Sequence, residues 1–116
     1  MMGSDHDNPL AAPFQGRWRI AETDLWDDES LDLVEPAAIT IDGADGDLRL
    51  VAIDATLDIR YDVRNGAPVA EFTFAGFDDN DQVTGRGWLQ PGTAGRLVGH
   101  LYVHHGDDSG FVCEPG

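Results

Sequence analysis

Hydrophobic and charged residues alternate most regularly in the middle of the chain, between Thr56 and Ala75. The first half of this stretch alternates apolar with charged side chains: Leu57, Ile59, Tyr61 and Val63 against Asp58, Arg60, Asp62 and Arg64. A period of two predicts a β-strand with one buried and one solvent-facing side. Asn65-Gly66 comes next, and this pair favours a two-residue hairpin turn, because both turn residues must adopt positive φ. The sequence therefore predicts an antiparallel hairpin.

The expected turn also determines the register of this hairpin. A two-residue turn at positions 65 and 66 pairs residue i with residue 131 − i. Ile59 then faces Phe72 on the buried side, and Arg60 faces Glu71 on the outer side. Because apolar residues meet apolar residues on one side of the hairpin, the alternation and the turn geometry predict the same pairing.

Further short strands, separated by turn-forming residues, follow from Phe14 onward. Gly, Asp and Pro gather at residues 42–46, 91–95 and 106–110, between apolar segments. With an opening strand from Phe14 to Glu22, about eight strands succeed one another in up-and-down order. Such a meander exposes two unpaired edges unless it closes on itself. We therefore expect an all-β fold, an antiparallel up-and-down barrel of lipocalin or streptavidin type.

Two segments do not follow the strand pattern. Residues 1–13 contain two prolines and show no periodicity, so we expect a flexible N-terminal tail before a single barrel domain over residues 14–116. One short helix is expected after the first strand, where Asp27 or Asp28 can cap it and Pro36 ends it.

The predicted barrel interior is nearly all large and apolar. It comprises Trp18, Ile20, Ile39, Ile41, Leu48, Leu50, Leu57, Ile59, Tyr61, Val63, Phe72, Phe74, Leu89, Leu97, Leu101, Val103 and Phe111. Gly87 and Gly99 fall on the same side and are expected to make room for Trp18, and Cys113 is expected as a small core residue. An eight-stranded barrel is just wide enough for side chains to fill it or to hold one small ligand. This inventory favours a filled core.

The charge of the chain excludes some partners. Of its 116 residues, 7 are basic and 22 acidic, which gives a net charge of −15, and all the basic residues are Arg. So negative a protein repels a phosphate backbone, and we expect no nucleic-acid partner. The sequence has no apolar run of ~18 residues, so no membrane contact is expected. Its one Cys cannot form an internal disulfide, which favours a cytoplasmic location.

Gly16-Arg17-Trp18 is the Gly-x-Trp motif that is typical of lipocalin-like barrels. Four longer stretches follow a more specific pattern: GRWRIAETDLWD (16–27), EPAAITIDG (35–43), FAGFDDNDQVTGRGW (74–88) and GHLYVHHGDDSGF (99–111). On these stretches, which cover most of residues 16–111, the chain resembles a family of small bacterial proteins without an assigned function. The resemblance implies a compact β domain and assigns no catalytic residue.

Side chains that can carry chemistry gather near the end of the chain. Residues 100–109 hold three of the four His, two Asp and one Ser. On a strand, His100, Tyr102 and His104 share the outer face while His105 points inward. Trp88 joins them if it pairs with residue 98 across the turn at residues 91–95, as we expect. The candidate ligand- or partner-binding residues are Trp88, His100, Tyr102, His104, His105 and Asp107.

Three more specific chemistries are disfavoured. The acidic run from Asp78 to Asp81 lacks the Gly and Glu of an EF-hand loop. His100 and His104 are ~13 Å apart on an extended strand, too far for one metal ion. Ser109 lies in a turn-forming segment with no nucleophile elbow around it. We therefore predict no catalytic residue, no cofactor and no metal site.

Two function classes remain open. We expect a non-catalytic binding or protein-interaction module for an unknown small molecule or protein, and a homodimer is one such arrangement. The alternative is a small enzyme with acid/base residues at the barrel mouth, drawn from Glu22, Asp24, Asp78, Arg86, His105 and Asp107.

The excess of acids makes a first prediction, on salt dependence. With 22 acids against 7 bases, like charges repel one another in the folded chain, and dissolved ions screen this repulsion. The melting temperature should therefore rise between low-salt buffer and molar NaCl, as measured by thermal unfolding. A flat or falling dependence would show that the carboxylates do not destabilise the fold.

Overall fold

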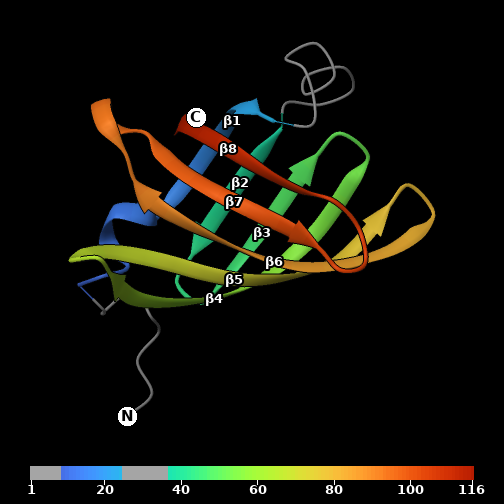
Figure 1. Ribbon diagram of the computed structural model, residues 1–116, viewed down its shortest axis with the longest axis horizontal. Coiled ribbons are helices and arrows are strands. Elements are labelled where there is room, and N and C mark those ends of the chain that lie inside the picture. Colours follow the sequence, from blue (N-terminus) through green and yellow to red (C-terminus); the bar gives the residue numbers. More distant parts are fainter. Residues whose placement is uncertain (1–8, 25–36) are drawn as a thin grey trace.

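The described residues form eight β-strands that pair in chain order (Figure 1). The computed structural model describes residues 9–24 and 37–116. Its strands are β1 (Gly16–Thr23), β2 (Ala38–Asp42), β3 (Asp45–Leu50), β4 (Ile53–Arg64), β5 (Ala67–Asp78), β6 (Asp81–Pro91), β7 (Leu97–Val103) and β8 (Asp108–Pro115). Each strand is antiparallel to the next, and β8 pairs back with β1, so the sheet closes into a barrel. This confirms the expected all-β, up-and-down barrel.

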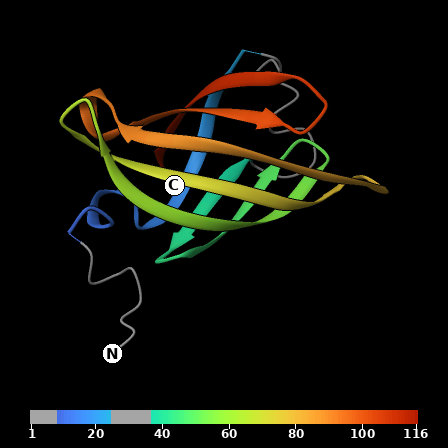
Figure 2. The ribbon, with the colours of Figure 1, turned by 60° about the horizontal axis from the view of Figure 1, so that its bottom comes forward.

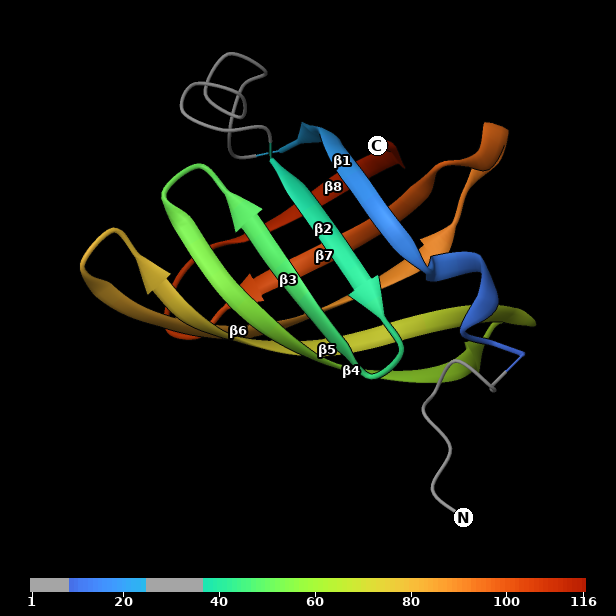
Figure 3. The same cartoon turned by 180° about the vertical axis from the view of Figure 1, so that it is seen from behind.

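The strands form two curved walls around one core. Figure 1 looks onto the wall of β5 to β8, and Figure 3 looks onto the opposite wall of β1 to β4. Figure 2 shows the long strands β4, β5 and β6 curving together along the barrel. Two short 3-10 helices, η2 (Ala12–Phe14) and η3 (Thr93–Gly95), accompany the strands. The helix expected between Asp27 and Pro36 lies outside the described residues.

The β4–β5 hairpin has the register that its sequence predicts. Ile59 pairs with Phe72 and Arg60 with Glu71, and the turn residues Asn65 and Gly66 have φ of 55° and 79°. Both strands are 12 residues long, whereas β3 pairs only with the part of β4 that ends at Asp58. The hairpin therefore extends beyond its neighbour on the β3 side.

This extension explains the main error in the predicted interior. Val63, expected inside, is 53% exposed, because it lies where β4 no longer has β3 beside it. Tyr61 and Val103 are only partly buried and pack against the core. Tyr61 lies at the barrel end, where its hydroxyl donates to the Gly43 carbonyl over 2.6 Å. The other residues of the predicted interior are buried, and so is Cys113.

Three phenylalanines pack over glycines on the next strand. Phe72 pairs with Gly87 and Phe74 with Gly85, while Gly99 pairs with Phe111. A methyl group added at Gly87 would lie 2.5 Å from the Phe72 ring. The glycines thus make room for phenylalanine rings, and the expectation that Gly87 and Gly99 accommodate Trp18 is wrong. Phenylalanine on one strand opposite glycine on the next fills the narrow interior without steric overlap.

The segment before β1 contributes to the core. Phe14 and Ala11 are fully buried, although the composition of residues 1–13 predicts a flexible tail that includes Ala11. Trp18 is buried as well, and its indole N–H donates to the Phe14 carbonyl over 2.9 Å. The Phe14 ring lies 5.8 Å from that of Tyr61. These aromatic side chains pack together at one end of the barrel.

The close packing of Phe74 over Gly85 predicts that alanine is poorly tolerated at position 85. The turn residue Gly66 provides a control substitution. In Gly85→Ala, the new methyl would lie 2.1 Å from the Tyr102 carbonyl oxygen and 2.5 Å from the Phe74 ring, so we expect a loss of roughly 3 kcal/mol or more in unfolding free energy. In Gly66→Ala, the methyl meets nothing within 4 Å, and only the positive φ is strained, which costs about 1–2 kcal/mol. Urea unfolding of both variants measures the difference. Equal losses would contradict this account of the core.

Candidate functional site

Acidic residues are distributed unevenly over the barrel surface. The outward positions of β5, β6 and β7 follow from their register with buried neighbours, and we call them the β5–β7 face. They are Glu71, Thr73, Ala75, Phe77, Gln82, Thr84, Arg86, Trp88, Gln90, Val98, His100 and Tyr102. Glu71 is the one acid among them. The outward positions of β3 and β4, by contrast, carry five: Asp45, Asp47, Asp54, Asp58 and Asp62.

Trp88, His100 and Tyr102 lie on this face, as the sequence predicts, but their register differs from the predicted one. Trp88 pairs with His100, so the expected pairing with Val98 is wrong. The reason is that Pro91 still belongs to β6 and pairs with Leu97, which places the loop at residues 92–96. The shift of two residues preserves the parity of the strand, and the side chains therefore remain on the predicted side.

Tyr102 is the centre of one group of contacts on this face. The guanidinium carbon of Arg86 lies 4.6 Å from the centroid of the Tyr102 ring, a distance typical of a cation–π contact. The His100 ring lies 4.6 Å from the same ring. On its other side, His100 Nε2 lies 2.5 Å from an Asp108 carboxylate oxygen. Guanidinium, phenol, imidazole and carboxylate thus form a continuous row across β6, β7 and β8.

Trp88 is the centre of a second group, which sequence reasoning missed. The Arg64 guanidinium carbon lies 5.5 Å from the centroid of the Trp88 ring, and the same guanidinium donates to Glu71 over 2.8 Å. Glu71 therefore pairs with Arg64, although Arg60 is its direct cross-strand neighbour. The predicted register contains the signal for this group, because it places Arg60, Arg64 and Glu71 on one side.

The remaining predicted residues lie in the turn after β7. His104 and His105 are exposed, with ring centroids 4.0 Å apart. The expected inward direction of His105 is wrong: β7 ends at Val103, and His105 has a φ of 58°, so the strand alternation does not reach it. Both histidines line a hollow of about 630 Å³ that also includes Arg86 and Tyr102. Asp107 is an exposed turn residue whose carbonyl accepts from the Val103 N–H over 3.0 Å.

Ser109 has a structural role in joining β8 to the end of β1. It is buried in β8, beyond the turn where we expected it, and its hydroxyl accepts from the Asp24 N–H over 3.0 Å and donates to the Gly110 carbonyl over 2.9 Å. The Asp24 carboxylate in turn accepts from the Gly110 N–H over 3.0 Å. These bonds satisfy the one polar side chain that is buried among the described residues.

The residues of the enzyme alternative lie on several different elements, and of these Arg86 and His105 line the same hollow. Asp24 is engaged with Gly110 at the end of β1, and Arg86 lies on the outer wall against Tyr102. Glu22, Asp78, His105 and Asp107 are exposed. In the part of the chain that the structure describes, no group of three or more His, Cys, Asp or Glu residues is close enough to hold a metal ion.

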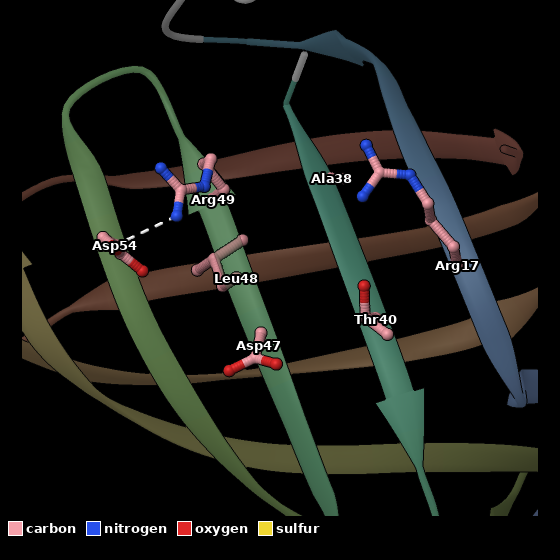
Figure 4. A pocket seen from close by; sticks show the side chains of 7 residues that line it. All are labelled: Arg17, Ala38, Thr40, Asp47, Leu48, Arg49 and Asp54. Atoms are coloured by element: carbon pink, nitrogen blue, oxygen red, sulfur yellow. Dashed lines mark hydrogen bonds and ion pairs between the residues drawn. The ribbon is translucent and has the colours of Figure 1, made fainter. Parts of the chain in front are cut away.

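The opposite wall has a second hollow, of about 440 Å³, which Figure 4 shows. Arg17 and Arg49 lie on either side of Ala38, and Asp47 and Asp54 complete the charged lining. Arg49 pairs with Asp54 over 3.2 Å. This hollow balances two bases with two acids and contains no aromatic side chain, so it lacks the stacked contacts of the β5–β7 face.

Comparisons with known proteins find no relative of this chain. No family model matches the chain, and neither a curated protein nor a solved structure is found to be similar to it. The resemblance to small bacterial proteins therefore stays a prediction. Within residues 9–24 and 37–116, no helix has the length and apolar character needed to cross a membrane.

The burial of Cys113 predicts how its thiol reacts in the native protein. Burial raises the pKa of its thiol to about 12, because the core disfavours the thiolate. A thiol reagent at pH 8 should therefore modify the native protein slowly and the urea-unfolded protein at once. The stability linked to this thiol should also decrease as the pH rises above ~9, since the unfolded chain releases the proton first. Rapid labelling of the native protein would contradict the buried position.

Proposed function

We propose that this protein is a non-catalytic binding or protein-interaction module, and that the β5–β7 face is its contact surface. The observation that carries the proposal is the row of stacked aromatic, cationic and imidazole side chains around Trp88 and Tyr102. Aromatic residues and Arg are enriched where binding energy concentrates in interfaces. The nearly acid-free wall around them supports the same conclusion, because desolvating carboxylates opposes binding.

The contacts already present on this face favour binding in a second way. Trp88 and Tyr102 are partly buried by their neighbours, and each has a guanidinium beside its ring. A side chain held by such contacts loses little rotamer freedom when a partner covers it, which lowers the entropic cost of association. The occupant we propose is a small molecule or a protein, a second copy of this chain included.

The enzyme alternative has less support. Acid/base catalysis generally uses carboxylates or histidines in water-excluded environments, whereas every described Asp, Glu and His is at least partly exposed. We also propose a cytoplasmic location, because the single Cys113 is a buried free thiol in the core and not part of a disulfide framework.

Single substitutions test the proposed face. Trp88→Ala and Tyr102→Ala should each weaken self-association or ligand binding by roughly thirtyfold, the effect of removing an aromatic anchor. His104→Ala should have a smaller effect, because His104 lies at the margin of the face. Sedimentation velocity measures self-association, and a thermal-shift screen of small molecules at fixed salt measures ligand binding.

Val63→Ala is the control, because it also shortens an apolar side chain at the surface but lies on the β4–β5 extension, outside the β5–β7 face. The control should behave like the unaltered protein in both measurements. If Trp88→Ala, Tyr102→Ala and His104→Ala all behave like the control, the β5–β7 face is not the contact surface.

A further inference from the structure

A hollow of about 230 Å³ lies between β4, β5 and β6, beside Trp88. Three of the seven arginines of the chain line it: Arg60, Arg64 and Arg86. Its acids are Asp58 and Glu71, so the lining has one positive charge more than negative. A local excess of positive charge is unexpected in a chain of net charge −15.

Only one of the three arginines in this hollow is engaged by an acid. Arg64 pairs with Glu71 over 2.8 Å and thereby neutralises it. Among residues 9–24 and 37–116, no carboxylate lies within ion-pair distance of Arg60 or Arg86. Both side chains are exposed, and the Arg86 contact is with the face of Tyr102. The two guanidinium groups therefore keep hydrogen-bond donors for another acceptor.

The register brings these two arginines to either side of Thr73. Thr73 pairs directly with Arg86 on β6 and with Asp58 on β4, and Arg60 is the next outward residue on β4. Adjacent strands are ~4.8 Å apart, so the backbones of β4 and β6 are about 10 Å apart. Arg60 and Arg86 line the hollow from its two sides, and the short Thr73 side chain lies between them. Its hydroxyl adds a third donor at the floor.

We propose that this hollow binds an organic anion, a carboxylate or a phosphate attached to a flat apolar group. Arg60 and Arg86 hold the oxyanion above Thr73, because guanidinium groups match the geometry of carboxylate and phosphate oxygens. The flat group lies toward Trp88, which lines the same hollow. The inference rests on the proposed binding function, since Arg86 and Trp88 belong to the β5–β7 face.

Two probes distinguish the two sources of the anionic group. Benzoate supplies the carboxylate and phenyl phosphate supplies the phosphate, each attached to one ring. Each is titrated into the full-length protein at constant ionic strength, and the arginine Nε–Hε signals are followed by NMR. We expect the signals of Arg60 and Arg86 to shift saturably in the millimolar range with at least one probe. The probe that saturates at the lower concentration identifies the preferred anion.

Charge-matched variants separate this site from general electrostatics. R60Q and R86Q should each weaken binding at least about tenfold, the effect of losing a charged hydrogen bond. R17Q is the control, because Arg17 is also exposed and has no carboxylate within ion-pair distance among the described residues, but it lies on β1. R17Q should bind as tightly as the unaltered protein.

Two results would overturn the inference. One is the lack of a saturable shift at Arg60 and Arg86 with either probe, and the other is an equal loss of affinity in R17Q. The proposed function is tested separately, by self-association and thermal shift of Trp88→Ala and Tyr102→Ala. If those variants lose binding while neither anion shifts the arginine signals, the binding face stands and only the anion site is wrong.

Discussion

The pairing of the first strand with the last is the interaction on which the rest of the molecule depends. β1 and β8 pair from Trp18 to Thr23 and from Phe111 to Pro115, and the bonds among Asp24, Ser109 and Gly110 continue the junction at one end. Arg19 and Glu114 add an exposed ion pair across it, at 2.7 Å. Exposed pairs contribute little to stability, so the backbone ladder and the buried Ser109 hydroxyl do most to hold the closure.

Closure also determines where the chemistry of this protein can lie. The ring of eight strands encloses a narrow space, and one continuous cluster of apolar side chains occupies it, with phenylalanine rings over Gly85, Gly87 and Gly99. Among the described residues, the polar side chains other than Ser109 are left at the surface. The same alternation that directs Phe72 and Phe74 inward directs Glu71 and Thr73 outward. Core and contact surface are thus two sides of the same strands.

The fold was largely predictable from sequence because its signals are local. A period of two together with Asn65-Gly66 determines a unique register, since a slip by one residue would turn every apolar side chain outward. The β6–β7 register was not predictable in the same way, because the Pro91–Gly95 segment allows several loop lengths. The sequence also does not show how far the β4–β5 hairpin extends beyond β3, and Val63 was expected inside the barrel for that reason.

The candidate site was predictable only in part. Parity alone placed Trp88, His100 and Tyr102 on one outer face, and it holds for any even shift in register. Strand parity does not determine which acidic residue forms an ion pair with a given arginine. Arg64 reaches Glu71 diagonally while Arg60, directly opposite, does not, a choice made by flexible side chains. The predicted direction of His105 is wrong because β7 ends at Val103, two residues earlier, and the alternation of inward and outward side chains ends with the strand.

The unequal walls of the barrel have an electrical consequence. The outward positions of β3 and β4 carry five aspartates and three arginines, a net charge of −2, whereas Glu71 and Arg86 cancel on those of β5 to β7, so these described positions contribute a dipole across the barrel. A molecule with such a dipole does not meet its neighbours at random orientations, because the acid-rich wall repels anions and other copies of the chain before contact. This contribution favours the approach of a negatively charged body to the wall that carries Trp88 and Tyr102 over its approach to the β3–β4 wall.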